Sequence, residues 1–103
     1  MQGADLIVSM TEKDQAQHDL RKTCLLNTAV ASNKLGDFTT TINKTTEALY
    51  IDDKAAKAYF LRAQAKKATK DFEGALTDIK EAIKLSPADK ALRDEFEAIK
   101  AAK

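Results

Sequence analysis

The sequence repeats itself with a period of 34 residues. The segment Leu-Gly-Asp-Phe that ends at Phe38 matches Thr-Lys-Asp-Phe that ends at Phe72. Further positions recur at the same offset: Ala29 and Ala63, Ala31 and Ala65, Glu47 and Glu81, Ala48 and Ala82, Ile51 and Leu85. A fixed period of this length is typical of solenoid proteins, in which each unit buries its apolar face against the next. The repeat therefore predicts a fold built by stacking similar units.

The composition and the spacing of apolar residues predict that these units are helical. The chain has only three glycines and one proline, the residues that most disfavour helix interiors. Gly36 and Pro87 follow predicted helix ends, as expected for these residue types. The predicted helices span about 15–35, 38–50, 55–69, 72–85 and 88–102. We therefore predict an all-α, antiparallel helix-pair solenoid.

The repeat also divides the chain. Two full repeats are expected at about 22–55 and 56–89, followed by a capping helix at about 88–102. The cap is predicted from one apolar stripe, formed by Leu92, Phe96 and Ile99, on an otherwise charged helix. Residues 21–103 thus form one repeat domain. We interpret residues 1–20 as the remnant of a preceding repeat or as a linker.

Charge and cysteine content exclude several classes of function. The 17 basic and 16 acidic residues give a net charge of +1, which favours neither nucleic acid nor an anionic membrane as partner. The second half is nonetheless basic: residues 54–103 carry 12 Lys and Arg against 8 Asp and Glu. That excess either attracts an acidic ligand or forms an ordinary solvated surface.

No apolar run approaches the length of a membrane span. A single cysteine, Cys24, favours a reducing compartment, so we expect a cytoplasmic or nuclear protein.

No catalytic or metal-binding set is visible. His18 is the only histidine and has no second ligand nearby, and Cys24 is expected to be a small buried residue beside the apolar stripe. We therefore predict no enzymatic activity and no cofactor.

The repeats resemble the tetratricopeptide (TPR) family. The resemblance rests on these positions: Leu25, Ala29, Ala48 and Ile51 in the first unit, and Tyr59, Ala63, Ala75, Ile79, Ala82 and Pro87 in the second. The first unit departs from the pattern at Ser32, Thr41, Thr45 and Asp53, and the second at Lys66. Residues 21–103 are most similar to TPR domains of large immunophilins, of the FKBP and cyclophilin kinds. The segments 25–29, 33–38 and 57–60 carry this similarity. It implies that one repeat is missing, and it allows a prolyl isomerase domain upstream in the parent protein, outside this chain.

The resemblance also implies a binding site. Such domains hold the acidic C-terminal tail of a heat-shock chaperone with five residues on their concave face. Asn27 matches the family's asparagine and Lys57 its lysine, whereas Leu61 stands where the family has arginine. An exposed, solvated role is the alternative for Asn27 and Lys57.

Other residues are expected on the same face. Phe60 and Gln64 would line the groove, although Phe60 also suits a core position, and Lys34 with Lys67 would add positive potential. The resemblance assigns two of the five residues to the missing repeat, and Leu61 replaces a third. Because three of five contacts are lost, we predict weak binding of the chaperone tail. The alternative function is a self-associating or domain-swapped scaffold that forms a homodimer and does not bind the tail.

Overall fold

The computed structural model describes the backbone of residues 2–103 and the side chains of residues 19–103. The helices are α1 Gln2–Leu35, α2 Phe38–Ile51, α3 Ala56–Ala68, α4 Phe72–Leu85 and α5 Lys90–Ala102. Residues 2–103 contain no β-strand. The prediction of an all-α fold is confirmed, and four of the five predicted helices agree with the structure to within two residues at each end.

The first helix differs from the prediction. It begins at Gln2 rather than near Gln15, so residues 2–14 continue α1 without an intervening turn. The physical reason is that neither glycine nor proline interrupts the chain between Gly3 and Gly36. The division of the chain at residue 20 stays a prediction, because continuity of the backbone does not tell which repeat these residues belong to.

Equivalent residues cap the second helix of each repeat. The Asp37 carboxylate accepts a hydrogen bond from the backbone N–H of Thr40 at 3.3 Å, and Asp71 accepts one from Gly74 at 3.1 Å. A side chain that satisfies an otherwise unpaired N–H at a helix start stabilises that helix. The two aspartates are 34 residues apart, so the sequence period sets where α2 and α4 begin.

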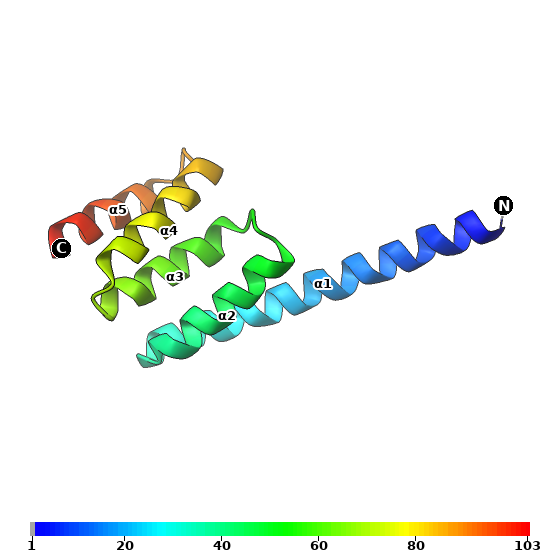
Figure 1. The fold of residues 1–103 in the computed structure, drawn as a ribbon, viewed down its shortest axis with the longest axis horizontal. Helices are drawn as coiled ribbons and strands as arrows, with labels where there is room; N and C mark the ends of the chain where they lie inside the picture. The colour runs from blue at the N-terminus through cyan, green and yellow to red at the C-terminus, as the bar shows by residue number, and fades with distance from the viewer. Residues whose placement is uncertain (1) are drawn as a thin grey trace.

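The helices form an antiparallel solenoid in which each helix packs against the next (Figure 1). α3 also contacts both α1 and α5, so these three helices line one side of the solenoid, while α2 and α4 lie on the other. The inner, concave face of such a solenoid is the usual place for a ligand. The N-terminal half of α1 extends beyond the other helices (Figure 1).

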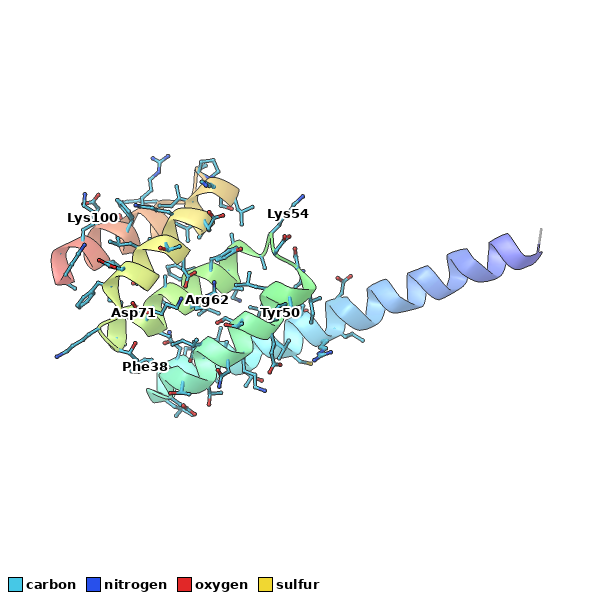
Figure 2. The ribbon with its side chains drawn as sticks, in the orientation of Figure 1. Phe38, Tyr50, Lys54, Arg62, Asp71 and Lys100 are labelled. Atoms are coloured by element: carbon cyan, nitrogen blue, oxygen red, sulfur yellow. The ribbon has the colours of Figure 1, made fainter. Side chains whose placement is uncertain are left out.

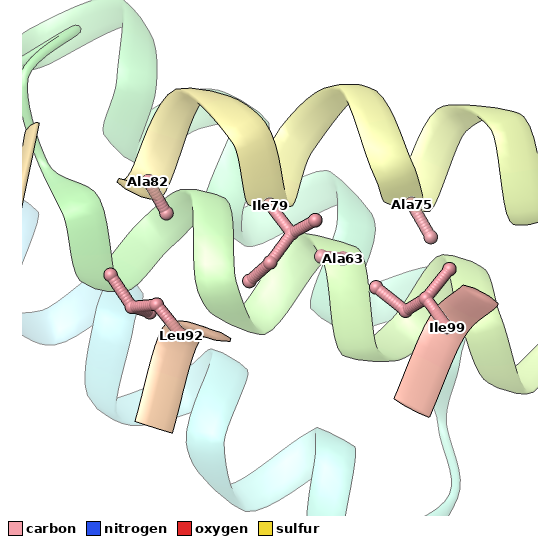
Figure 3. Packing of buried hydrophobic residues seen from close by; sticks show 6 residues of the cluster. All are labelled: Ala63, Ala75, Ile79, Ala82, Leu92 and Ile99. Atoms are coloured by element: carbon pink, nitrogen blue, oxygen red, sulfur yellow. The ribbon is translucent and has the colours of Figure 1, made fainter. Parts of the chain in front are cut away.

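Alanines allow the helices to pack closely. Between α3, α4 and α5 the buried cluster consists of Ala63, Ala75, Ile79, Ala82, Leu92 and Ile99 (Figure 3). All but Leu92 are fully buried, and Leu92 is 4% exposed. Leu25, Ala48, Leu49 and Ala58 form a second cluster between α1, α2 and α3. The stripe predicted for the capping helix is thus confirmed at Leu92 and Ile99, which cover the end of the core.

Three of the four residues at which the first repeat departs from the family pattern form a small polar core. Thr41 and Thr45 are fully buried, and Ser32 is 6% exposed. The hydroxyls of Ser32 and Thr41 lie 2.7 Å apart, and Thr45 donates a 2.7 Å hydrogen bond to the carbonyl of Thr41. Buried hydroxyls cost little free energy when they are hydrogen-bonded, so polar residues at these three positions are compatible with stable packing.

Candidate functional site

An open cleft lies between α3 and the start of α5. Its volume is about 420 Å³, and it is lined by Ala56, Lys57, Phe60, Ser86, Asp89, Ala91 and Leu92. Lys57 is exposed in the first turn of α3, and Phe60 lies half-buried three residues later on the same helix face. Two of the predicted site residues, Lys57 and Phe60, are therefore brought together. The cleft offers a cation beside an apolar wall.

The same cleft also contains a carboxylate. Asp89 is the N-cap of α5 and accepts a 3.0 Å hydrogen bond from the N–H of Ala91. Its charge offsets that of Lys57 and repels any carboxylate of a ligand. Sequence reasoning missed this residue as part of the site, although an aspartate that closely follows Pro87 is a recognisable helix start.

The middle of α3 is tied to its neighbours. The Asn33 side chain donates a 3.2 Å hydrogen bond to Gln64, which links α1 to α3. Further along α3, the Lys67 ammonium lies 2.7 Å from a carboxylate oxygen of Glu95 on α5. Lys67 is therefore neutralised by an ion pair rather than free to add positive potential. The concave face is held in shape by these two links between helices.

The remaining predicted residues do not line the cleft. Asn27 and Lys34 are exposed on α1, and Leu61 is only 6% exposed. A buried leucine at the position of the family's arginine leaves no group there to hold a carboxylate. The structure therefore gathers Lys57 and Phe60 and leaves Asn27, Lys34 and Gln64 outside the cleft.

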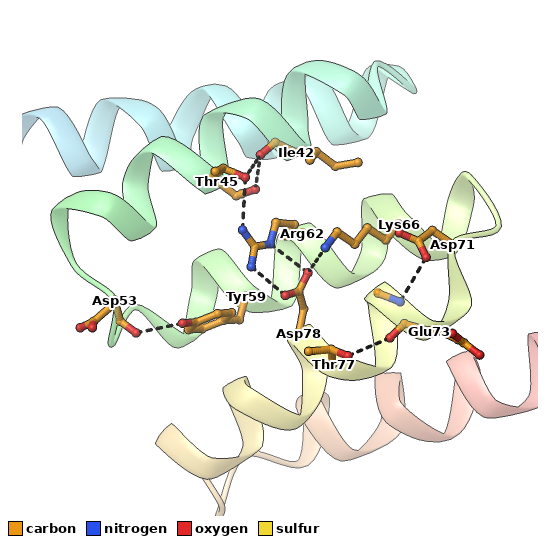
Figure 4. Close-up of polar contacts among 12 residues, drawn as sticks. Ile42, Thr45, Asp53, Tyr59, Arg62, Lys66, Asp71, Glu73, Thr77 and Asp78 are labelled. Atoms are coloured by element: carbon orange, nitrogen blue, oxygen red, sulfur yellow. Dashed lines mark hydrogen bonds and ion pairs between the residues drawn. The ribbon is translucent and has the colours of Figure 1, made fainter.

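Sequence reasoning missed a buried charge cluster formed by Arg62, Lys66 and Asp78 (Figure 4). Arg62 donates two hydrogen bonds to the carboxylate of Asp78, at 2.9 and 2.8 Å, and Lys66 lies 3.1 Å from the same carboxylate. Arg62 also donates to the hydroxyl of Thr46 at 3.2 Å and lies 5.7 Å from the Tyr59 ring. The cluster joins α2, α3 and α4. The signal for it was the presence of Asp78 within the apolar stripe of α4.

The single cysteine lies on the surface of α1. Cys24 is exposed, so the expectation that it is buried was wrong. Leu25 is the residue that faces the core, and its neighbour on a helix points about 100° away.

His18 lies outside the residues whose side chains are described. Residues 19–103 hold no group of His, Cys, Asp or Glu that could bind a metal ion, and none of the described helices is long and apolar enough to cross a membrane.

Comparisons with known proteins agree with this architecture. The sequence matches no protein-family model. Two curated rice (Oryza sativa subsp. japonica) proteins, DnaJ protein P58IPK homolog A and homolog B, are each 44% identical to the chain over 61 residues. That match covers 59% of the chain and only 13% of either rice protein.

Solved structures are similar over more of the chain. The C-terminal TPR-containing domain of a Plasmodium falciparum FK506-binding protein superposes with a TM-score of 0.78 and 25% identity, covering 82% of this chain and 56% of that one. This chain folds as a tetratricopeptide repeat domain. The second TPR domain of human RPAP3, solved with the HSP70 peptide SGPTIEEVD, superposes with a TM-score of 0.74 and 24% identity. This superposition covers 77% of this chain and 66% of the RPAP3 domain chain.

The arrangement of this TPR domain is that of an interaction module. The side formed by α1, α3 and α5 carries the open cleft that contains Lys57, Phe60 and Asp89. Such a surface can hold an extended peptide or a partner helix.

Proposed function

We propose that the concave face of this TPR domain binds the acidic C-terminal tail of a heat-shock chaperone, and that it does so weakly. The observation that carries the proposal is the placement of Lys57 and Phe60 in one open cleft. An exposed ammonium can make a charge-assisted contact with a terminal carboxylate, and the phenyl ring offers an apolar contact for the side chain beside it. The similarity to chaperone-associated TPR domains supports this choice of ligand.

Two features of the face account for low affinity. Leu61 replaces a cationic side chain, and Asp89 adds a carboxylate to the cleft. Each charge-assisted contact contributes about 1.5–3 kcal/mol, whereas micromolar binding requires about 8 kcal/mol in total. Loss of the contact at Leu61, together with repulsion from Asp89, removes about half of that free energy. We therefore expect a dissociation constant near the millimolar range.

The test is a titration of the isotope-labelled domain with a peptide that ends in Glu-Glu-Val-Asp, followed by NMR. We expect fast-exchange shifts of the amides around Lys57 and Phe60, with a dissociation constant of about 1 mM. Lys57→Ala should remove the shifts, because no other lysine lines the cleft. Lys54→Ala is the matched control, since Lys54 is exposed just before α3 and outside the cleft.

The peptide itself provides a second control. Amidation of its C-terminus removes the terminal carboxylate and should weaken binding as strongly as Lys57→Ala does. A micromolar dissociation constant would contradict the account of low affinity. The absence of shifts around Lys57 at several millimolar peptide would overturn the proposed function.

A further inference from the structure

A second cleft lies between α4 and α5, at the C-terminal end of the domain. It has a volume of about 310 Å³ and is lined by Leu76, Lys80, Phe96, Lys100 and Lys103. Each of the two helices contributes an apolar residue and a lysine, at the same spacing. On α4 the pair is Leu76 and Lys80, and on α5 it is Phe96 and Lys100. Residues four apart lie on one helix face, so each helix presents an apolar side chain and a lysine to the cleft.

The lysines of this cleft have no acidic partner in the described part of the chain. Among the described residues, the lysines that form ion pairs are Lys22, Lys66, Lys67 and Lys84, and none of them lines this cleft. No aspartate or glutamate lines the cleft, and the Lys100 ammonium lies 5.2 Å from the centre of the Phe96 ring. That contact, a cation over an aromatic ring, leaves the positive charge uncompensated. Lys100 stands out from the end of α5 in Figure 2. This cleft therefore differs from the Lys57 cleft, where Asp89 supplies a negative charge.

The floor of the cleft is apolar. Leu76 and Phe96 pack against the core between α3, α4 and α5, yet both remain partly exposed. Partly exposed apolar side chains at the bottom of a cleft can contact an apolar side chain of a partner. A volume of about 310 Å³ accommodates one or two side chains of a partner.

We propose that this cleft is a second protein-binding site, which holds an acidic peptide segment through an apolar side chain placed between carboxylates. Charge complementarity carries the choice of partner: three unpaired lysines surround two apolar residues. It also agrees with the excess of basic over acidic residues in 54–103. Binding here needs no free C-terminus, because the carboxylates can come from side chains. The proposal does not rest on the function proposed for the concave face.

The test uses a fluorescein-labelled peptide Glu-Glu-Leu-Phe-Glu-Glu, amidated at its C-terminus, and fluorescence anisotropy with the full chain. The amide excludes binding that requires a terminal carboxylate. We expect saturable binding that weakens when salt is raised, because charges at an exposed cleft are screened. The double variant Lys80→Glu with Lys100→Glu should weaken binding at least about tenfold, since two attractive contacts become repulsive.

Controls separate this site from general attraction between opposite charges. Lys90→Glu changes the charge on α5 at an exposed residue outside the cleft and should alter the affinity by less than about twofold. A peptide with glycines in place of leucine and phenylalanine should bind at least about tenfold more weakly, because it lacks the apolar anchor. Circular dichroism confirms that each variant keeps its helical content.

Several outcomes would overturn the proposal. One is the absence of saturable binding at about 1 mM peptide, and another is an equal effect of the double variant and Lys90→Glu. Equal affinity for the glycine peptide would show a nonspecific charge effect. Binding to vesicles of anionic phospholipid without binding to the peptide would assign the cleft to a membrane surface instead.

Discussion

At the scale of single residues, the main finding is a buried carboxylate that holds two cations. The side chain of Asp78 is 3% exposed, whereas those of Arg62 and Lys66 are 18% and 22% exposed. Taking a carboxylate out of water is costly unless it is paired and hydrogen-bonded, and here two basic groups surround it. The pairing explains how a charged residue can occupy the apolar stripe of α4.

We predict that Asp78→Ala lowers the free energy of unfolding by roughly 3 kcal/mol, because it leaves two largely buried cations without their partner. Glu81→Ala is the control on the same helix, since its ion pair with Lys84 is exposed and worth at most about 0.5 kcal/mol. Urea denaturation followed by circular dichroism measures both. Equal effects of the two substitutions would contradict a special role for Asp78.

At the scale of helices and turns, the 34-residue period also governs the turns between α1 and α2 and between α3 and α4. Gly36 and Lys70 occupy equivalent positions, and both have positive φ, at 82° and 68°. This left-handed conformation strains a residue with a side chain but costs glycine nothing. The two turns thus have the same shape, with a favourable residue in one and an unfavourable residue in the other.

Introducing glycine at position 70 and removing it at position 36 should therefore have opposite effects on stability. Lys70→Gly should stabilise the domain by about 0.5–1 kcal/mol, and Gly36→Ala should destabilise it by about 1 kcal/mol. No atom lies within 4 Å of a Cβ added at Gly36, so the cost there comes from the backbone alone. Lys54→Gly tests whether any glycine in a turn stabilises the domain, because Lys54 has no positive φ. If it stabilises as Lys70→Gly does, the explanation from φ is wrong.

The link between α1 and the turn after α2 depends on pH. The Lys22 ammonium donates a 2.9 Å hydrogen bond to Asp52, which also accepts one from the N–H of Lys54. The hydrogen bond from Lys22, followed by that from Lys54, lowers the pKa of Asp52 below its ordinary value. A carboxylate whose pKa is lower in the folded chain stabilises the fold above the ordinary pKa. That contribution is lost as the pH falls through the lowered pKa.

We predict that Lys22→Met raises the pKa of Asp52 toward its ordinary value of about 3.9. A titration of the side-chain carboxyl by NMR measures this change directly. The difference in melting temperature between wild type and variant should also shrink as the pH falls below about 4 and through the lowered pKa, because Asp52 then becomes protonated in both proteins. Lys44→Met serves as the control, since Lys44 is not among the groups that shift this pKa. An unchanged pKa in Lys22→Met would refute the ion-pair explanation.

At the scale of the whole molecule, stability is concentrated in the stacked helices. Within residues 19–35 of α1, whose side chains the structure describes, the buried residues are Leu25, Ala29 and Ser32. The N-terminal part of the helix extends beyond the solenoid (Figure 1). Helices that stack bury their apolar faces only where a neighbour is present. The extended part of α1 is therefore expected to contribute little to folding.

Deletion of residues 1–14 should accordingly change the melting temperature by less than about 2 °C. The variant Ile79→Ala removes apolar side-chain volume from the centre of the core and should lower the free energy of unfolding by about 2–4 kcal/mol. It serves as the positive control for a loss of core packing. Light scattering on the full and shortened chains adds a separate result. A fall in molar mass from dimer to monomer after the deletion would support the self-association alternative.

The sequence by itself determined the helices and their order, because these follow from local chemistry and from a period that repeats. The apolar stripes, the capping aspartates Asp37 and Asp71 and the scarcity of glycine and proline are all visible without a structure. Only the tertiary structure decided what each charged or polar side chain faces. It paired Arg62 with Asp78 and Lys67 with Glu95, buried Leu61, and left Lys80 and Lys100 unpaired beside an apolar floor. The reason is that a polar side chain's partner lies on another helix, and the angle at which two helices stack is not encoded in the spacing of either one.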